Sequence, residues 1–482
     1  MLSQRSLIQK LQAYIHHKPT DDQAAACACL AQFFATKPGD ACMILRGFAG
    51  TGKTTLLAAL VGVLEAQGIN CLLLAPTGRA AKVLQNTTRR TASTIHKAIY
   101  TVSENGDGQP LFGLAHNEDV ETVYIIDEAS MIGSHGDGAL IPSHGSLLDD
   151  LVQFVSSGQD CRLLLAGDTA QLPPINDPES PALSDDCMLR YFHSVLSYTM
   201  RDIVRQDKQS GILHWATHTR NLIERSPNLL PQFSTDHFPD IHILAPNQLF
   251  ESLYSSYRTV GPDETIIVCR SNRAAVRYNQ YIRSNILDYH DPICPGDYLM
   301  VCKNNYLWAK KSKPNDFLAN GEIIKALRIE HEQAIEDFNF VNLDFVLPDQ
   351  PKLEISATAM LNVLNASSPA LDYNASSRLY ALRIKDIMAA RHRARGRQML
   401  NSDPYFQALQ LKYAYAVTCH KAQGGQWKHV YVVFELYPSI PHDALLLRWI
   451  YTALTRATEQ LYLICPSPQL LTQEAYQALM NR

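Results

Sequence analysis

The chain has 482 residues and a net charge of −4, with 46% hydrophobic and 19% charged residues. This length exceeds one ordinary domain and predicts two or more hydrophobic cores. No apolar run reaches the about 20 residues that a membrane-spanning helix needs, and the 11 cysteines form no CxxC pair that would indicate a zinc cluster or a disulfide framework. We therefore expect a cytoplasmic protein without membrane contact. Any contact with nucleic acid must be confined to a local part of its surface.

The first clear pattern along the chain is a glycine-rich segment between a predicted strand and a predicted helix. The apolar residues 42–46 precede Gly-Phe-Ala-Gly-Thr-Gly-Lys-Thr at 47–54, which fits G-x-x-x-x-G-K-[ST]. Glycines let backbone N–H groups curl around phosphate oxygens, the lysine reaches the outer phosphates, and the hydroxyl can ligate Mg²⁺. An ordinary glycine-rich turn is the weaker alternative, because every fixed position is filled. The predicted nucleotide-binding residues here are Gly47, Gly50, Thr51, Gly52, Lys53, Thr54 and Thr55.

Two carboxylates follow the next apolar strand, residues 123–126. The carboxyl ends of parallel strands are where α/β proteins bind ligands, so Asp127 is the predicted metal ligand and Glu128 the predicted base for the attacking water. A helix N-cap is the alternative for this pair. A third strand, residues 161–166, leads to Gln171, which could contact the γ-phosphate. Spacing alone fits a proline-terminated loop equally well.

Two segments interrupt this alternation of strands and helices. Residues 98–114 contain two strand-like runs around Asn105 and Gly106, which is a strong hairpin signal. We hypothesise that this hairpin separates the strands of a duplex, with Tyr100 and Phe112 available for stacking. A surface hairpin without function is the alternative. Residues 133–146 are rich in glycine and predict a mobile loop whose histidines are solvated rather than metal-bound.

The second half of the chain predicts another sheet that is split in sequence. Its expected strands are residues 265–269, 414–418, 429–434 and 460–464. An insert of roughly 130 residues separates the first two strands, which is far longer than an ordinary loop. Alternating apolar residues in this insert predict a small antiparallel barrel. Its basic runs, 310–313 and 391–397, fit solvated faces or contacts with phosphate.

Eight segments occur in one order that resembles a known family. They are GFAGTGKT, LLLAPTGRAAKVL, TASTIHK, IIDEASMI, GDTAQLPP, IVRQ, AYAVTCHKAQGGQW and YTALTRA. This set resembles the RecD-like group of superfamily-one DNA helicases, which includes RecD and Dda and moves 5′→3′. The resemblance implies an α/β fold with two RecA-like P-loop domains, an inserted hairpin and a small barrel, and it implies ATP and Mg²⁺ as cofactors.

The resemblance also implies roles for individual residues. Gln23 matches the glutamine that recognises adenine, and Arg205 and Arg456 match the two arginines that reach the γ-phosphate from the second domain. Gln423 and Gly424 belong to the segment that links ATP to nucleic acid. The residues that match positions along a single-strand track are Pro76, Thr77, Arg79, Thr94, His96, Thr418, His420 and Lys421. Without the resemblance, the arginines fit interdomain salt bridges and the histidines fit capping or core positions.

These patterns predict the division of the chain and its activity. The first domain is predicted at 1–195 with the hairpin insert at 98–122, the second at 196–285 and 411–482, and the barrel-like module at 286–410. The leading hypothesis is an ATP-dependent DNA helicase that acts as a monomeric motor on single-stranded DNA and on junctions with duplex. A nucleic-acid-stimulated ATPase clamp and an RNA helicase remain open, because a phosphate track does not recognise the 2′-hydroxyl. The motifs fit DNA repair and recombination, and they identify no protein partner.

Overall fold

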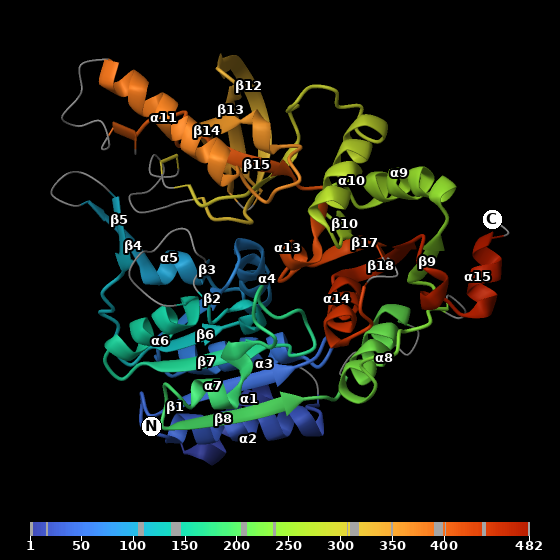
Figure 1. The fold of residues 1–482 in the computed structure, drawn as a ribbon. Helices are drawn as coiled ribbons and strands as arrows, with labels where there is room; N and C mark the ends of the chain where they lie inside the picture. The colour runs from blue at the N-terminus through green and yellow to red at the C-terminus, as the bar shows by residue number, and fades with distance from the viewer. Residues whose placement is uncertain are drawn as a thin grey trace.

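The structure is a computed structural model, and Figure 1 shows its three parts, two α/β units and a β-barrel module. Two parallel sheets lie side by side, and a barrel with one long helix lies above them. The predicted fold class, two RecA-like domains with an inserted hairpin and a barrel, is confirmed. The structure describes residues 3–15, 18–104, 110–135, 146–203, 210–234, 238–305, 307–308, 318–348, 350–389, 399–400, 402–435 and 440–480.

The first sheet has six parallel strands in the order β3-β2-β6-β7-β1-β8. Its strands are β1 (Ala41–Gly47), β2 (Cys71–Ala75), β3 (Ala92–Thr94), β6 (Val123–Ile126), β7 (Arg162–Gly167) and β8 (Ser194–Met200). The helices of this part are α1 (Gln4–Tyr14), α2 (Asp21–Ala35), α3 (Lys53–Ala66), α4 (Gly78–Thr88), α5 (Ile95–Ile99), α6 (Leu147–Ser157) and α7 (Asp185–Met188).

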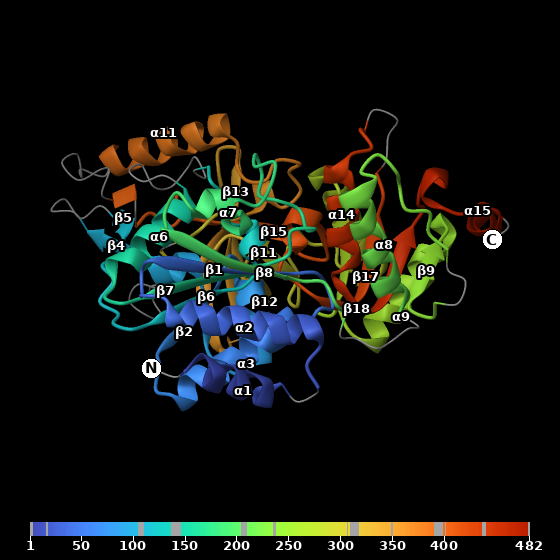
Figure 2. The ribbon, with the colours of Figure 1, turned by 90° about the horizontal axis from the view of Figure 1, so that it is seen from below.

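Alternate side chains of strand β1 enter two different cores, one on each face of the first sheet. Met43 and Leu45 pack with α1, α2 and α3, whereas Cys42 and Ile44 pack with α5 and α6. This alternation is the period of two that a strand buried on both faces must show. Figure 2 shows α1, α2 and α3 together on one side of the sheet. Strand β8 runs past the predicted domain boundary at residue 195.

The second sheet has five parallel strands in the order β16-β10-β17-β18-β9. Its strands are β9 (Ile241–Leu244), β10 (Thr265–Cys269), β16 (Ala416–Thr418), β17 (Trp427–Val433) and β18 (Ala457–Ile464). The predicted strands are present, and the short β9 was not predicted. The helices of this part are α8 (Gly211–Arg225), α9 (Leu249–Thr259), α10 (Asn272–Asn285), α13 (Cys419–Ala422), α14 (Ala444–Leu454) and α15 (Gln473–Met480).

A closed five-stranded barrel lies between β10 and β16 in the sequence. Its strands are β11 (Tyr298–Val301), β12 (Ile323–Ile335), β13 (Phe338–Leu347), β14 (Gln350–Met360) and β15 (Leu409–Tyr413). The prediction of an antiparallel barrel was wrong at one pair, because β14 and β15 run parallel. Helix α11 (Tyr373–Ala389) lies between these two strands and makes a parallel return possible. The barrel shares one hydrophobic core with the second sheet, including Ile267, Leu299 and Phe345.

The predicted hairpin is present as strands β4 (Tyr100–Glu104) and β5 (Pro110–Leu114), paired antiparallel. Its turn, residues 105–109, lies outside the described residues, and so do residues 136–145 of the predicted mobile loop and both basic runs, 310–313 and 391–397. The Tyr100 hydroxyl donates to Asp150 Oδ2 in α6 at 2.6 Å. Tyr100 therefore anchors the base of the hairpin, which argues against its predicted stacking role. None of the helices in the described ranges is long and apolar enough to cross a membrane.

Candidate nucleotide and nucleic-acid sites

Three neighbouring strands of the first sheet end at one edge and supply the candidate nucleotide site. β6, β7 and β1 are adjacent and parallel, and their pairing aligns Ile126 with Leu165 and Arg46 with Gly167. The loop after β1 is the glycine-rich segment, the residue after β6 is Asp127, and the residue after β7 is Asp168. Sequence segments that are far apart are thus brought together at the carboxyl edge, where α/β sheets bind ligands.

The glycine-rich loop has the backbone that its glycines permit. Gly50 and Gly52 have φ angles of +80° and +81°, and a Cβ atom on Gly47 would lie 2.9 Å from Thr51 Oγ1. The Lys53 ammonium donates to the Gly47 carbonyl at 3.1 Å across the mouth of the loop. This loop closes on the N-terminus of α3, whose cap residue is Gly52. Exposed backbone N–H groups at such a helix terminus form a cradle for phosphate oxygens.

The two predicted acidic residues differ in environment. Burial raises the pKa of Asp127 to about 6, and the nearby Lys53 ammonium opposes this shift. Asp127 Oδ1 accepts the Glu128 backbone N–H at 2.9 Å. Glu128 has a left-handed backbone with φ +54°, which is rare for a residue other than glycine. The hydroxyl of Thr54 and the carboxylate of Asp127 are the oxygen ligands that Mg²⁺ prefers, so this donor set fits that ion.

Three of the predicted ATP-site residues carry buried polar atoms that have no hydrogen-bond partner within the described ranges. The atoms are Gln23 Nε2, Glu128 Oε2 and Gln171 Oε1. The other amide atom of Gln23, Oε1, accepts the Thr20 N–H at 3.2 Å in a capping box. Leaving a buried polar group unsatisfied costs about 1–3 kcal/mol, so each such atom calls for a partner. These three atoms are therefore available to a polar ligand of the site.

One of the two predicted γ-phosphate arginines, Arg205, lies outside the described residues. The other, Arg456, is bonded within its own domain. Arg456 is 3% exposed and donates to Thr452 O, Gly425 O and Thr455 Oγ1 at 2.9, 3.0 and 3.1 Å, all in its own domain. Its guanidinium would have to leave these partners to reach a phosphate.

Two other arginines of the second domain contact the first domain and were not predicted. Arg448 in α14 donates to the Thr169 carbonyl, next to the predicted site. Arg220 in α8 lies with its guanidinium 4.5 Å from the ring centroid of Phe48, which belongs to the glycine-rich loop. Neither residue lies within a recognised segment, so sequence patterns gave no signal for them.

Gln423 and Gly424 join the second domain to the first. Gln423 Nε2 donates to the Leu172 carbonyl at 2.6 Å. Thr452 Oγ1 accepts the Leu172 N–H at 2.9 Å. Gly424 has φ +69°, and a Cβ atom there would lie 2.6 Å from the Cβ of Ala80 in α4. Glycine is therefore required for this close approach. The predicted linking segment does contact the loop after β7 and the start of α4.

Three predicted track residues are threonines that immediately precede helices. Thr77 and Thr94 accept N–H groups of α4 and α5 at 3.2 Å, from Ala80 and Lys97, and Thr418 precedes α13. Thr94 and Thr418 are the last residues of β3 and β16, and Thr77 lies two residues after β2; β3 and β16 are edge strands and β2 is next to an edge. The N-terminus of α4, which Pro76 precedes, offers a positive dipole end for a phosphate.

Other predicted track residues are committed to contacts within the protein. The Arg79 guanidinium lies 3.8 Å from the ring centroid of Trp427 and donates to the Gln426 carbonyl at 2.9 Å, so it bridges the two domains. Burial lowers the pKa of Arg79 to about 10, which leaves it charged at neutral pH. Burial also lowers the pKa of His420, which favours a neutral ring. The His96 ring lies 5.7 Å from that of Tyr100.

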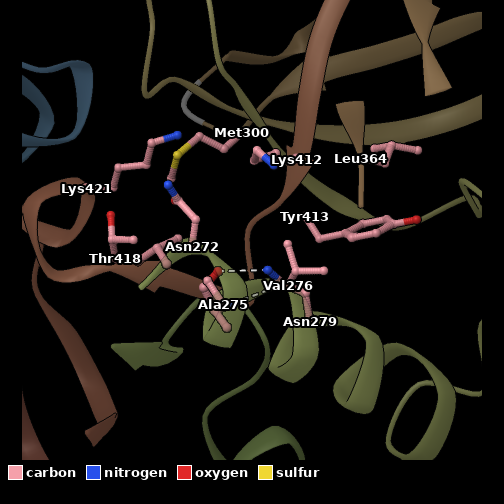
Figure 3. Close-up of a pocket in the computed structure, with 12 residues that line it drawn as sticks. Asn272, Ala275, Val276, Asn279, Met300, Leu364, Lys412, Tyr413, Thr418 and Lys421 are labelled. Carbon is pink, nitrogen blue, oxygen red and sulfur yellow. Dashed lines mark hydrogen bonds between the residues drawn. The ribbon is translucent and has the colours of Figure 1, made fainter. Parts of the chain in front are cut away.

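Lys421 and Thr418 line a small pocket between the second sheet and the barrel. Figure 3 shows them on one side of this pocket, with Lys412 and Leu364 of the barrel module on the other. Lys412 is a structural residue, because its ammonium donates to the carbonyls of Val363 and Ala366 and burial lowers its pKa. Sequence patterns did not identify this lysine.

The barrel also contacts the first domain beside the predicted track. Glu322, between β11 and β12, accepts from the Lys97 ammonium of α5 at 3.1 Å. A Cβ atom on Gly78, the first residue of α4, would lie 3.2 Å from Glu322 Cγ. A carboxylate of the barrel therefore lies against the helix terminus at which a phosphate is predicted to bind.

Comparison with known proteins finds similarity to helicases. The family described as an AAA domain matches residues 20–221, and the UvrD-like helicase C-terminal domain matches residues 413–464. The chain is 24% identical over 451 residues to the ATP-dependent RecD2 DNA helicase of Deinococcus radiodurans. Both the family matches and this relative agree with the resemblance to superfamily-one helicases of the RecD-like group. The match covers 88% of this chain but 47% of the relative, so the chain spans about half of the relative's length.

Other matches of the chain are more distant. An uncharacterised protein of Acanthamoeba polyphaga mimivirus is 21% identical over 484 residues, which covers 86% of this chain and 94% of that protein. A structure of two coordinating Pif1 helicases at forked duplex DNA has a TM-score of 0.45 at 15% identity. Bacteroides Pif1 with ADP-AlF3 and single-stranded DNA has a TM-score of 0.44 at 15% identity, and each structural match covers 96% of both chains.

Proposed function

We propose that this chain is an ATP-dependent DNA helicase that moves 5′→3′ along single-stranded DNA and separates duplex. The observation that carries the proposal is the set of unpartnered buried atoms on Gln23, Glu128 and Gln171 around a phosphate-binding loop. The similarity to helicase domains and to a RecD2 helicase supports the reaction type. The direction of movement rests on the resemblance of the eight ordered segments.

Each residue at the edge of the first sheet has a role in the proposed hydrolysis. Lys53 and the N–H groups of the loop bind the outer phosphates, and Gln23 donates to adenine. Thr54 and Asp127 would hold Mg²⁺, which when bound neutralises charge on the phosphates. Glu128 accepts the proton of the attacking water, and its unpartnered Oε2 is available for that hydrogen bond.

Single-stranded DNA would bind on the side that faces the barrel. The start of α4 and the side chains of Thr94, Thr418 and Lys421 offer backbone and side-chain donors to phosphates, which favours binding without base recognition. The hairpin β4–β5 follows α5 directly, so it lies beside this track and is the proposed strand-separating element. In this structure Glu322 covers part of the track, and binding would displace it.

ATP turnover with and without nucleic acid tests the proposal. We expect single-stranded DNA to stimulate hydrolysis by the wild-type chain. Glu128→Gln should keep binding of a fluorescent ATP analogue and lower turnover by about 10²-fold or more, because it removes the base. Glu330→Gln, on the exposed side of β12, is the matched control and should behave as the wild type. A wild-type rate that DNA does not change would contradict the proposal, and equal stimulation by RNA would favour the RNA helicase.

A further inference from the structure

One buried hydroxyl of the second domain contacts both loops that frame the candidate ATP site. Tyr451 in α14 is 1% exposed. Its hydroxyl accepts the N–H of Ala49 in the glycine-rich loop at 2.8 Å and donates to Asp168 Oδ2 at 2.7 Å. The phenol therefore both accepts and donates a hydrogen bond, and both partners belong to the first domain.

The two partners of this hydroxyl are placed next to the groups that handle phosphate. Ala49 directly precedes Gly50, whose left-handed backbone shapes the loop. Asp168 holds the turn that carries Gln171, because its Oδ1 accepts the Ala170 N–H at 2.9 Å and its carbonyl accepts the Gln171 N–H at 3.3 Å. A movement of α14 would thus be transmitted to the loop and to this turn at the same time.

The surroundings make this contact specific to the hydroxyl. The Tyr451 ring packs with Phe48, Ala170 and Ala216, so it stays in place without its oxygen. Burial beside the Asp168 carboxylate raises the pKa of Tyr451 well above its usual value, so the phenol remains a donor at neutral pH. Arg456, five residues later in the same segment, is bonded within its own domain in this structure.

We propose that Tyr451 is a positioning residue for ATP hydrolysis, which sets the Ala49 amide and the Asp168–Gln171 turn when the two domains are closed. The inference rests on the proposed function. It assigns to the Tyr451 hydroxyl part of the coupling between domain closure and ATP hydrolysis. It predicts an effect on turnover rather than on nucleotide affinity, because the hydroxyl contacts the supports of Gln171 and of the loop and not the base or sugar of the nucleotide.

The test compares two buried tyrosines of the second domain. Tyr451→Phe removes the hydroxyl at the interface. Tyr431→Phe is the matched control, since its hydroxyl bonds only within that domain, to Ser252 and Ser256 at 2.8 and 2.7 Å among the described residues. We expect Tyr451→Phe to lower DNA-stimulated kcat by about tenfold, the effect of one hydrogen bond to a charged group, with the KM for ATP changed by less than about threefold. Tyr431→Phe should keep the wild-type kcat.

Two outcomes would overturn the inference while leaving the proposed function intact. One is a Tyr451→Phe chain with wild-type kcat, and the other is an equal loss of kcat in both variants, which would indicate a general effect of a lost buried hydroxyl. A double variant, Tyr451→Phe with Asp168→Asn, gives a second measure. If part of the effect of the hydroxyl passes through Asp168, the double variant loses less than the sum of the two single losses, and fully additive losses would overturn the inference. Failure of the wild-type chain to hydrolyse ATP would instead contradict the proposed function itself.

Discussion

Glu128 combines a strained backbone with an unsatisfied side chain. Its φ of +54° lies in the left-handed region, and its Oε2 is buried without a partner in the described part of the chain. A residue in this backbone region costs of order 1–3 kcal/mol, and such strain concentrates at functional sites. The Asp127 carboxylate holds the conformation by accepting the Glu128 N–H. These features fit a side chain that is held ready for a water molecule rather than for a contact within the protein.

Arg456 presents a different case, because other protein atoms bind its guanidinium in this structure. Its guanidinium makes three hydrogen bonds within the second domain. We expect Arg456→Ala to lower turnover by about 10³-fold or more if the side chain reaches the γ-phosphate during hydrolysis, with ATP binding retained. The same substitution should lower the unfolding temperature, because it leaves the Gly425 and Thr452 carbonyls without this donor.

Steady-state turnover and thermal unfolding, measured on the same samples, separate these two effects. Arg225→Ala, at the exposed end of α8, is the control and should change neither quantity. A less stable Arg456→Ala chain with nearly wild-type turnover would show that the residue is structural, which is the alternative that the sequence alone left open.

Sequence patterns predict those residues whose proposed chemistry requires one amino-acid type at a fixed distance along the chain from its neighbours. Lys53, Asp127 and Glu128 belong to this class, since a phosphate loop and a strand end restrict them locally. Tyr451 could not be found in this way, because it meets Ala49 across 402 positions and the contact depends on how two domains pack. The hydrogen bonds of Arg456 within its own domain also depend on packing, and no local sequence pattern predicts them.

Helices α4 and α5 share one local feature, a threonine N-cap at or just after the end of a strand. Thr77 caps α4 two residues after β2, and Thr94 caps α5 as the last residue of β3. Such a cap stabilises the helix by about 1 kcal/mol and fixes the direction in which its first N–H groups point. The same sequence feature thus serves the fold and prepares a surface for phosphate.

The hairpin β4–β5 carries a separate prediction. We expect replacement of residues 101–111 by a short Gly-Ser turn to abolish duplex unwinding, because a strand-separating element acts only on base pairs. DNA-stimulated ATP hydrolysis and movement on single strands should remain, since Thr94 and α5 are untouched. Strand displacement measured beside ATP turnover checks this, and unchanged unwinding would show that the hairpin is a surface decoration.

The pattern of elements was predictable where apolar runs are uninterrupted and bounded by turn residues. Strands β1, β6, β7 and β10 are of this kind. Strand β9, Ile-His-Ile-Leu, has a polar histidine within it, unlike the equally short β6. The parallel pairing of β14 with β15 could not be inferred from alternation, because alternation fixes the face of each side chain and not the direction of the strand.

Polar contacts join the first domain to the rest, together with apolar contacts of Phe48 and Ala170 with Ala216 and Tyr451, and of Leu172 with the core of the second sheet. The barrel and the second sheet have a common core, whereas the first sheet has its own cores on each face. Hydrogen bonds from Tyr451, Gln423 and Arg79 cross the interface, and the Lys97–Glu322 pair ties the barrel to α5. Interfaces of this composition permit relative motion of domains, which a translocating enzyme requires.

Strand displacement on duplexes with a single-stranded tail at either end tests the proposed helicase most directly. We predict that the chain separates a 5′-tailed duplex only when ATP is present and leaves a 3′-tailed duplex paired. Lys53→Ala should separate neither substrate, because it lacks the ammonium that binds the outer phosphates. DNA-stimulated ATP hydrolysis without separation of either duplex would contradict the proposal and support a clamp, and separation of the 3′-tailed duplex alone would contradict the direction of movement.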